Sequence, residues 1–246
     1  MSDEVRGVSE RLRRFVDEAP YERRSILQFV RSCARSLPAG ARVADVGAGD
    51  SPYRELFAHC EYISVDWDQS VHRGAANADI ISSADSITLP DETVDAALLT
   101  QVLEHVPSPS AVLAEVGRVL RPDGHVFLTV PFIWELHELP HDYFRYTPAS
   151  LQLLLEGAGF LDITITPRND CFTTIAQLLL NARWAMGRAG DELDAERDRV
   201  CQVLKEVSDS IAALAPLDVL RIMPLGYSVI GRRGRDGNPE SGRVLP

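Results

Sequence analysis

The stretches VADVGAGD (Val43–Asp50) and EYISVD (Glu61–Asp66) decide the fold of this chain. The first begins as an apolar run and breaks into a glycine-rich turn, and the second is another apolar run that ends in a carboxylate. This layout is typical of a nucleoside-binding βαβ unit, in which a glycine turn lets the backbone approach a ligand. The acid at the end of the second strand accepts hydrogen bonds from ribose hydroxyls. The pattern predicts an adenosine-containing cofactor.

The composition predicts one main domain and disfavours a nucleic-acid partner. The chain has 246 residues, of which 45% are hydrophobic and 25% are charged. A chain of this size can bury a single α/β core and leave roughly thirty to fifty residues for additions. The formal net charge is −11. Affinity for a phosphate backbone depends mainly on lysine and arginine, so RNA and DNA are not expected as partners.

The cysteine pattern and the N-terminus predict a soluble, cytoplasmic protein. The cysteines are widely spaced with no CxxC pair, which fits neither a disulfide framework nor a zinc site. We expect them to be reduced and mostly in the core. Residues 1–14 are charged and have no apolar signal core, and no apolar run reaches membrane-spanning length, so no membrane partner is expected. The cysteines are Cys33, Cys60, Cys171 and Cys201.

Apolar spacing predicts the domain organisation. Helical periodicity before the first strand, ended by the LPAG stretch, indicates an N-terminal helical cap at 1–40 that packs on the main domain. The main domain is expected at 41–232, with a helical insert at 171–220 before the last strand. The tail at 233–246 has too little apolar content to fold alone and is expected to be flexible.

Strand and helix patterns alternate through the main domain, which implies right-handed crossovers and a largely parallel sheet with helices on both faces. Helix 109–121 has an apolar stripe at i, i+3, i+4 spacing, a cap at Ser108 or Ser110, and a terminating turn at Arg121–Gly124. The expected strands are 42–46, 61–66, 79–81, 94–99, 125–130, 161–166 and 227–230, and the expected helices are 52–58, 109–121 and 148–157.

Several blocks of residues, in this order and spacing, resemble the class I S-adenosylmethionine-dependent methyltransferases. Over about Arg42–Phe160 the chain is similar to the type 11-like branch, which has VLEHV and RVLRPDG segments. The resemblance implies a doubly wound, Rossmann-like, mostly parallel seven-stranded sheet with strand order 3-2-1-4-5-7-6. It also implies a transferase that uses S-adenosyl-L-methionine and releases S-adenosyl-L-homocysteine. The blocks are Asp45–Gly49, Val65–Asp66, Ala84–Pro90, Gln101–Val106 and Arg118–Gly124.

The resemblance implies a role for each cofactor residue. Asp45 helps to hold the ammonium of the methionine moiety, and the turn glycines let the backbone pass where a Cβ would collide. Asp66 takes the ribose hydroxyls, Trp67 covers an adenine face, and the Asp85–Ser86 pair meets the adenine edge. Ser51 replaces the third glycine of the usual GxGxG pattern. The full expected set is Asp45, Gly47, Ala48, Gly49, Asp66, Trp67, Asp85, Ser86 and, near the methionine end, Gln101.

Methyl transfer from a sulfonium is an in-line displacement, so catalysis depends mainly on orientation, which can contribute about 7–11 kcal/mol in model systems. A base adds roughly 10²–10⁴-fold when the acceptor is a hydroxyl or a protonated amine. The loop at 132–147 follows the strand at 125–130, where the carboxyl edge of the sheet opens toward a ligand. The catalytic candidates are His141, His137, His105 and Tyr143, and His141 is preferred because Asp142 and Tyr143 follow it.

The acceptor is expected to be a small molecule with an oxygen nucleophile, or less favourably nitrogen. The HDYxRYT run at His141–Thr147 resembles a feature of bacterial methyltransferases that act on saccharides or natural products. Several of these residues also have a plain structural explanation, because loop histidines brace turns and Arg145 and Tyr146 can hold the loop together. Glu135, His137, His141 and Asp142 offer mixed oxygen and imidazole ligands for a divalent ion, but no ligand spacing is diagnostic and no metal is expected.

Two other classes remain as alternatives. A nicotinamide-dependent Rossmann oxidoreductase shares the glycine turn and the acidic strand end, and nicotinamide binding without S-adenosylmethionine binding would favour it. A non-catalytic binding protein with the methyltransferase fold is the second, because fold does not dictate function. A homodimer is left open, since the Leu178–Leu180 run can lie in the core or on a dimer surface.

Overall fold

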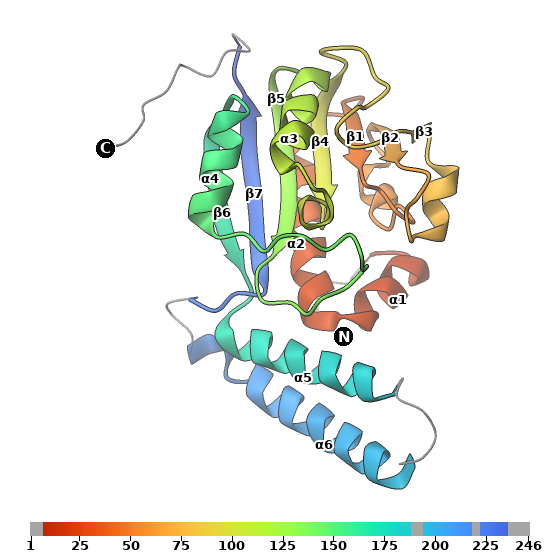
Figure 1. The fold of residues 1–246 in the computed structure, drawn as a ribbon, viewed down its shortest axis with the longest axis vertical. Coiled ribbons are helices and arrows are strands. Elements are labelled where there is room, and N and C mark those ends of the chain that lie inside the picture. The colour runs from red at the N-terminus through yellow and green to blue at the C-terminus, as the bar shows by residue number, and fades with distance from the viewer. Residues whose placement is uncertain (1–6, 188–193, 218–221, 236–246) are drawn as a thin grey trace. The chain divides into compact units, whose positions relative to one another are not determined.

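The computed structural model describes residues 7–187, 194–217 and 222–235, which divide into two compact units (Figure 1). The sheet unit contains Phe29–Thr166 and Tyr227–Pro246, and the helical unit contains Met1–Gln28 and Pro167–Gly226. Most of the expected tail at 233–246 lies outside the described residues. The domain boundaries expected from the sequence remain a prediction.

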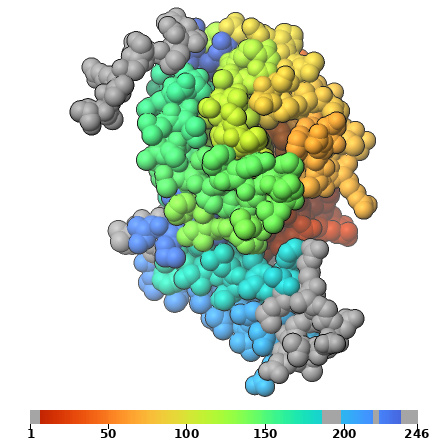
Figure 2. All heavy atoms as spheres, viewed as in Figure 1, coloured from red at the N-terminus to blue at the C-terminus, as the bar shows by residue number. Residues whose placement is uncertain are grey.

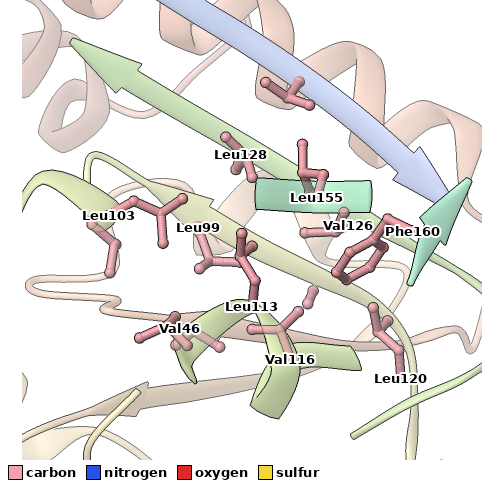
Figure 3. Packing of buried hydrophobic residues seen from close by; sticks show 14 of the residues in the cluster. Val46, Leu99, Leu103, Leu113, Val116, Leu120, Val126, Leu128, Leu155 and Phe160 are labelled. Carbon is pink, nitrogen blue, oxygen red and sulfur yellow. The ribbon is translucent and has the colours of Figure 1, made fainter. Parts of the chain in front are cut away.

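The seven strands form one sheet in the order β3-β2-β1-β4-β5-β7-β6, which confirms the predicted fold class and strand order. The paired strands β1–β2, β1–β4, β2–β3 and β4–β5 are parallel, whereas β7 runs opposite to β5 (Figure 3). The strands are β1 (Arg42–Val46), β2 (Glu61–Asp66), β3 (Ile80–Ile81), β4 (Val94–Thr100), β5 (Leu120–Pro131), β6 (Phe160–Arg168) and β7 (Gly226–Arg233).

The strand order reverses between β1 and β4, and this switch point positions the site. From β1 the chain proceeds outward to β2 and β3, then returns to place β4 on the other side of β1. In open α/β sheets the crevice beyond the carboxyl ends of two such strands takes the ligand. Val43 is paired with Tyr62 on one side and with Ala96 on the other, so β1 lies inside the sheet.

Apolar side chains of the sheet and of the helices on one face form the core. The helices α3 (Pro109–Val119) and α4 (Pro148–Gly157) cover the near face of the sheet in Figure 1. Leu113 and Val116 of α3 point toward Leu99 and Val126 of the strands (Figure 3), and all four are fully buried. Full burial of one such side chain contributes about 1.5–3 kcal/mol.

Local structure differs from the sequence expectation at two connections. The helix predicted at 52–58 is only a 3₁₀ turn, η2 (Arg54–Phe57). Helix α3 ends at Val119 rather than at residue 121, because β5 begins at Leu120. The predicted turn at Arg121–Gly124 is an irregularity within β5, since Val94 pairs with Leu120 but Ala96 pairs with His125. Ser108 occupies the N-cap position of α3 without a capping hydrogen bond from its side chain.

The helical unit is held by side-chain contacts between distant parts of the chain. In it, Glu22 and Arg168 form a buried ion pair of 2.8 Å, and Gln177 accepts hydrogen bonds from the backbone of Tyr21 and Glu22. Among the described helices, none is long and apolar enough to cross a membrane. The helices are α1 (Glu10–Glu18), α2 (Pro20–Ser36, which continues into the sheet unit), α5 (Cys171–Gly187) and α6 (Asp194–Ala212), with a 3₁₀ turn, η6 (Ala215–Leu217).

The cysteines are free thiols, as expected, but most of them are not in the core. Cys33 is buried and burial raises the pKa of its thiol to about 12. Cys60, Cys171 and Cys201 are partly exposed. The expectation of mostly buried thiols was therefore wrong, because three of the four lie at a loop or on helix surfaces rather than on the inner faces of the sheet.

Candidate active site

The glycine turn after β1 has the backbone conformation that its sequence predicts. Gly47 has φ +71° and Gly49 has φ +53°, in the left-handed region that glycine adopts without strain. A Cβ on Gly47 would lie 2.6 Å from a methyl of Val102, so any other residue there would force the Val102 side chain to shift. Ser51, which replaces the third glycine, has φ +48°. The turn therefore retains a left-handed residue at this position although the glycine is absent.

The side chain of Asp66 links this turn to the end of β2 by a hydrogen bond. Its Oδ2 accepts a hydrogen bond of 2.6 Å from the backbone N–H of Gly49, and its Oδ1 accepts one of 2.8 Å from Trp67. The side chain is 5% exposed. A carboxylate can accept about four hydrogen bonds, so each oxygen keeps a lone pair for another donor.

Asp45 is a buried carboxyl at the carboxyl half of β1. It is 1% exposed, and its Oδ2 accepts a hydrogen bond from the Tyr62 hydroxyl on the neighbouring strand. Its Oδ1 accepts no hydrogen bond from any residue in the described part of the chain. Burial raises the pKa of Asp45 to about 7, with a smaller contribution from the charge of Asp66 and an opposing one from the Tyr62 hydrogen bond. A cation beside Oδ1 would stabilise the ionised form.

The other expected cofactor residues are less tightly grouped. Trp67 is half-buried at the end of β2, where its ring lies edge-on to that of His141 at 5.4 Å. Gln101 has φ +57°, and its side chain donates to the Thr129 hydroxyl at the end of β5. Asp85 and Ser86 are exposed, and among the described residues no side-chain hydrogen bond or ion pair joins them to the other cofactor residues.

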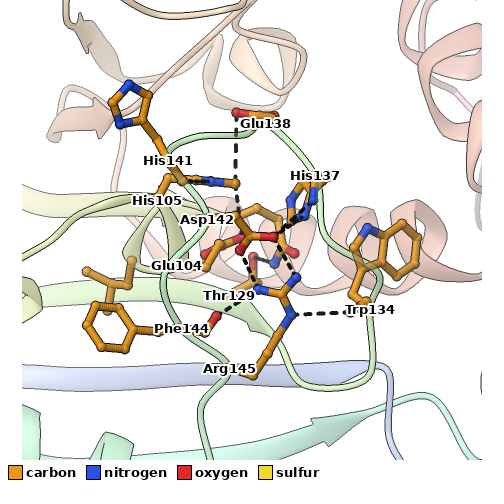
Figure 4. A network of polar contacts seen from close by, with 12 residues as sticks. Glu104, His105, Thr129, Trp134, His137, Glu138, His141, Asp142, Phe144 and Arg145 are labelled. Atoms are coloured by element: carbon orange, nitrogen blue, oxygen red, sulfur yellow. Dashed lines mark hydrogen bonds and ion pairs between the residues drawn. The ribbon is translucent and has the colours of Figure 1, made fainter.

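The loop at 132–147 is organised by one buried ion pair (Figure 4). Arg145 contacts both oxygens of Asp142, at 2.6 and 3.0 Å, and also donates to the backbone carbonyls of Glu135 and Phe144. The side chain of Asp142 has no exposed surface, and the arginine lowers its pKa to about 2. The hydroxyl of Tyr146 donates to the carbonyl of Leu103. Arg145 and Tyr146 therefore both make contacts that hold the loop together.

Two histidine side chains, His105 and His137, lie beside this ion pair, and a third, His141, lies apart from it (Figure 4). His105 lies in the 3₁₀ turn η4 (Leu103–His105), and its Nδ1 is 2.7 Å from the backbone carbonyl of His141. Its ring is 4.7 Å from that of His137. The Nδ1 of His137 lies 3.2 Å from the carbonyl of Glu135 and 3.4 Å from Asp142. The side chain of His141 lies apart from Asp142, and its Nδ1 is 3.1 Å from the Tyr143 hydroxyl.

Two contacts tie the loop to the segment after β2. His72 lies 3.2 Å from Glu138, and Trp67 touches His141. The hydrogen bond with Glu138 raises the pKa of His72 and the bond with His72 lowers the pKa of Glu138, whereas burial lowers the pKa of His105. In Figure 2 the green atoms of the loop border the orange atoms of the segment after β2 on the outer surface of the sheet unit.

The structure thus brings Asp45, Asp66 and the glycine turn together at one edge. It gathers the rings of His105 and His137 in a second cluster, and places the ring of His141 against Trp67. Sequence reasoning missed Tyr62 and Glu138. Tyr62 had a weak signal, because the parallel register pairs it with Val43, two residues before Asp45, on the same face of the neighbouring strand. Glu138 had no signal, since its contacts depend on the path of an irregular loop.

Comparison with known proteins agrees with this geometry. Residues 44–128 match a family profile described as a methyltransferase domain. Over this region the chain is similar to the class I S-adenosylmethionine-dependent methyltransferases. The cofactor of this family is S-adenosyl-L-methionine. The matched region ends inside β5, so it covers the glycine turn, Asp66 and Glu104 but not the loop at 132–147.

Relatives of this methyltransferase domain match over part of their length. An uncharacterized methyltransferase of Mycobacterium sp. (strain JLS) is 35% identical over 105 residues, which are 40% of this chain and 42% of that protein. A ubiquinone biosynthesis O-methyltransferase of Xanthomonas axonopodis pv. citri (strain 306) is 28% identical over 140 residues, 52% of this chain and 53% of that protein. The chain therefore spans about half the length of the curated relatives it matches.

A solved structure extends the likeness over most of the chain. A SAM-dependent methyltransferase from Archaeoglobus fulgidus superposes with a TM-score of 0.55 at 19% identity, covering 89% of this chain and 99% of that one. At this identity the likeness concerns the fold alone.

Proposed function

We propose that this methyltransferase domain moves a methyl group from S-adenosyl-L-methionine to an oxygen nucleophile of a small molecule. The observation that carries the proposal is Asp45, a buried carboxyl beside the glycine turn whose Oδ1 accepts no hydrogen bond in the described part of the chain. An α-ammonium is the kind of group that fits such an acceptor.

The residues of the turn fit the remainder of this cofactor. Asp66 has acceptor capacity left for ribose hydroxyls, and Trp67 offers a half-buried ring at the same edge for a purine. We assign Gln101 to the methionine end and Asp85 with Ser86 to the adenine edge. When bound, the cofactor supplies a methyl group on a positively charged sulfur. The protein's contribution is to hold and orient the cofactor and the acceptor and to exclude water.

We assign the removal of the acceptor proton to His141. Its ring lies next to Trp67 and therefore near the proposed purine site, and Tyr143 contacts its Nδ1 at 3.1 Å. When Nδ1–H donates to the Tyr143 hydroxyl, Nε2 keeps a lone pair for the proton of an acceptor hydroxyl. His137 and His105 are the other candidates, because the Nδ1 of each faces a backbone carbonyl and Nε2 can accept a proton. The contact with Trp67 is what favours His141.

The finer assignment of the acceptor rests on similarity. The Xanthomonas relative is described as an O-methyltransferase, which favours oxygen over nitrogen. The HDYxRYT run favours a saccharide or a natural-product intermediate.

Free cysteines and the acidic charge favour a cytoplasmic protein without a nucleic-acid partner. Fractionation of cells and the mass of the purified protein in solution test the location and the possibility of a homodimer.

Calorimetric titration tests the cofactor. S-adenosyl-L-methionine and S-adenosyl-L-homocysteine should bind the purified chain, whereas NADH and NADPH should not. Binding of a nicotinamide cofactor alone would replace this proposal with the oxidoreductase alternative. Binding of S-adenosyl-L-methionine without transfer to any acceptor in a broad panel of sugars, phenols and amines would favour the non-catalytic alternative.

Histidine variants test the base. With an acceptor from that panel, His141→Ala should lower kcat by about 10²–10⁴-fold and leave the Kd of S-adenosyl-L-methionine nearly unchanged. His125→Ala is the matched control, because His125 lies at the middle of the long strand β5, paired with Ala96 of β4, away from the loop. An unchanged kcat in His141→Ala would move the role to His137 or remove it altogether.

A further inference from the structure

Glu104, His105 and His137 form a group that the cofactor site does not use. One ligand atom from each, a carboxylate oxygen or an imidazole nitrogen, lies within 4.8 Å of the other two. Glu104 is fully buried, and His105 and His137 are partly buried (Figure 4). They come from two places in the chain, the turn η4 after β4 and the loop after β5, which meet at the carboxyl edge of the sheet.

From this geometry we propose that Glu104, His105 and His137 bind a divalent transition-metal ion, of which Zn²⁺ is the best match. Two imidazoles and one carboxylate form the ligand set of many catalytic zinc sites, which keep a further position open for water or substrate. Imidazole nitrogen also selects against Mg²⁺ and Ca²⁺, which prefer oxygen ligands.

The separations between the side chains match those across a shared ion. The Nε2 of His105 is 3.8 Å from Glu104 Oε1, which is longer than a hydrogen bond. Two zinc bonds of about 2.1 Å at a tetrahedral angle place their ligand atoms roughly 3.4 Å apart. Closing the pair of His105 and Glu104 onto an ion therefore needs an approach of about 0.4 Å. A pair at the 4.8 Å limit of the group needs an approach of about 1.4 Å, shared between two side chains.

The orientation of both imidazoles is a second, independent observation. His105 donates from Nδ1 to the carbonyl of His141, which leaves Nε2 facing Glu104 as an acceptor. The Nδ1 of His137 faces the carbonyl of Glu135 and the carboxylate of Asp142. Histidines that bind metals almost always place their other nitrogen against a carbonyl or carboxylate in this way, which fixes the tautomer.

The charges around the group favour a cation. Glu138 Oε2 lies 3.9 Å from the Nε2 of His105, so carboxylates approach this nitrogen from two sides. The nearby Arg145 is occupied by its two contacts with Asp142. A divalent ion would bring positive charge to a cluster in which three carboxylates, those of Glu104, Glu138 and Asp142, outnumber the guanidinium of Arg145 and the imidazole of His72.

The proposed ion refines the proposed function but does not depend on it for binding. With His105 and His137 on the ion, His141 remains as the base. The open position on the ion can take the acceptor's hydroxyl oxygen and lower its pKa. This catalytic role, unlike the binding of the ion, rests on the proposed methyl transfer. It favours an acceptor with a hydroxyl oxygen.

Zinc binding by the full chain tests the proposal. After treatment with a chelator, the chain should bind one Zn²⁺ in a competition titration with a coloured indicator. His105→Gln and His137→Gln should each weaken this affinity by about 100-fold or more, because even loss of an outer-shell partner costs 10–100-fold. His125→Gln, the matched control, should bind like the parent. Millimolar Mg²⁺ should not displace the zinc.

Several outcomes would overturn the site. They are absence of Zn²⁺ binding at micromolar concentration, equal affinity in the two histidine variants and the control, or displacement by Mg²⁺. Because Glu104 is fully buried, Glu104→Gln is used only after circular dichroism shows that this variant folds. His137 is partly exposed, so His137→Gln is sufficient to test the site. Zinc binding without S-adenosyl-L-methionine binding would refute the proposed function and leave the metal site intact. The converse result would refute only the metal site.

Discussion

Asp45→Asn should change the pH dependence of both stability and cofactor affinity. The pKa of Asp45 is about 7 in the folded chain because the carboxyl is buried, whereas its model value is 3.8. Between these values the folded state keeps a proton that the unfolded chain releases. The stability that this carboxyl contributes is therefore fully present below pH 4 and is lost as the pH rises through 7. Asparagine keeps the neutral shape and the acceptor for Tyr62, and it cannot ionise.

The magnitude follows from the two pKa values. A shift of about three units corresponds to about 4 kcal/mol between the low-pH and high-pH limits, at 1.36 kcal/mol per unit. Most of this is lost between pH 5 and pH 8, where the parent should lose about 2–3 kcal/mol relative to Asp45→Asn. At pH 8 the variant should be the more stable protein without ligand. Its affinity for S-adenosyl-L-methionine should nevertheless fall about 10–100-fold, as expected for losing a charge-assisted hydrogen bond.

Urea unfolding at several values between pH 5 and pH 8 measures the first effect, and calorimetric titration at the same values measures the second. In the parent, affinity should rise with pH below 7, because an ammonium binds the ionised carboxyl and expels its proton. Asp123→Asn is the control, since Asp123 pairs with Arg232 and Arg235 and those partners lower its pKa. A difference in unfolding free energy between parent and Asp45→Asn that stays constant with pH would refute the buried-carboxyl reasoning. Equal affinity would refute the ammonium assignment.

Three further substitutions probe other contacts. Gly47→Ala should destabilise the chain by about 1–2 kcal/mol from the positive φ alone, measured by urea unfolding. Adding Val102→Ala to this variant should remove only the further cost of the clash between the new Cβ and the Val102 methyl. Asp66→Ala should weaken S-adenosyl-L-methionine binding about 10-fold or more with the circular dichroism retained, and unchanged calorimetric binding would contradict the ribose assignment. Arg168→Met should cost about 3–5 kcal/mol because it leaves the buried Glu22 unpaired; a change in unfolding free energy below 1 kcal/mol would contradict this.

Most of the sheet could be predicted from the sequence because its signals are local. The strands at 42–46 and 61–66 were predicted to the residue, since buried apolar runs with abrupt ends mark both limits. The prediction of a helix at 52–58 was wrong. The polar and apolar residues of this segment fit a helical period over only two turns, and a 3₁₀ turn satisfies the same spacing. The sequence could not reveal that β5 begins at Leu120, since this depends on its pairing with Val94.

The site could be predicted only in part, for a related reason. Asp45 and Asp66 stand at strand ends, where the topology alone brings them to one edge. The pairing of Asp142 with Arg145 and His137, rather than with His141, depends on the path of a loop without repeating backbone geometry. Glu104 lies inside the segment Gln101–Val106, which resembles the methyltransferase family. Its burial beside two imidazoles could not be predicted from the sequence, because it depends on how the loop packs.

The two clusters of the site are physically coupled, because the segment after β2 touches both. Trp67 donates to Asp66 through its backbone and touches His141 with its ring. His72 pairs with Glu138 in the loop and lies so near the turn that a Cβ on Gly49 would be 3.3 Å from its ring. A ligand that binds only the ordered form of this segment stabilises that form by RT ln(1 + [L]/Kd), about 2.7 kcal/mol at 100 times Kd. The loop shares these contacts, so part of that free energy is expressed as a more ordered loop. We therefore expect the histidine cluster to be most ordered when the cofactor is bound. The acceptor would then bind after the cofactor.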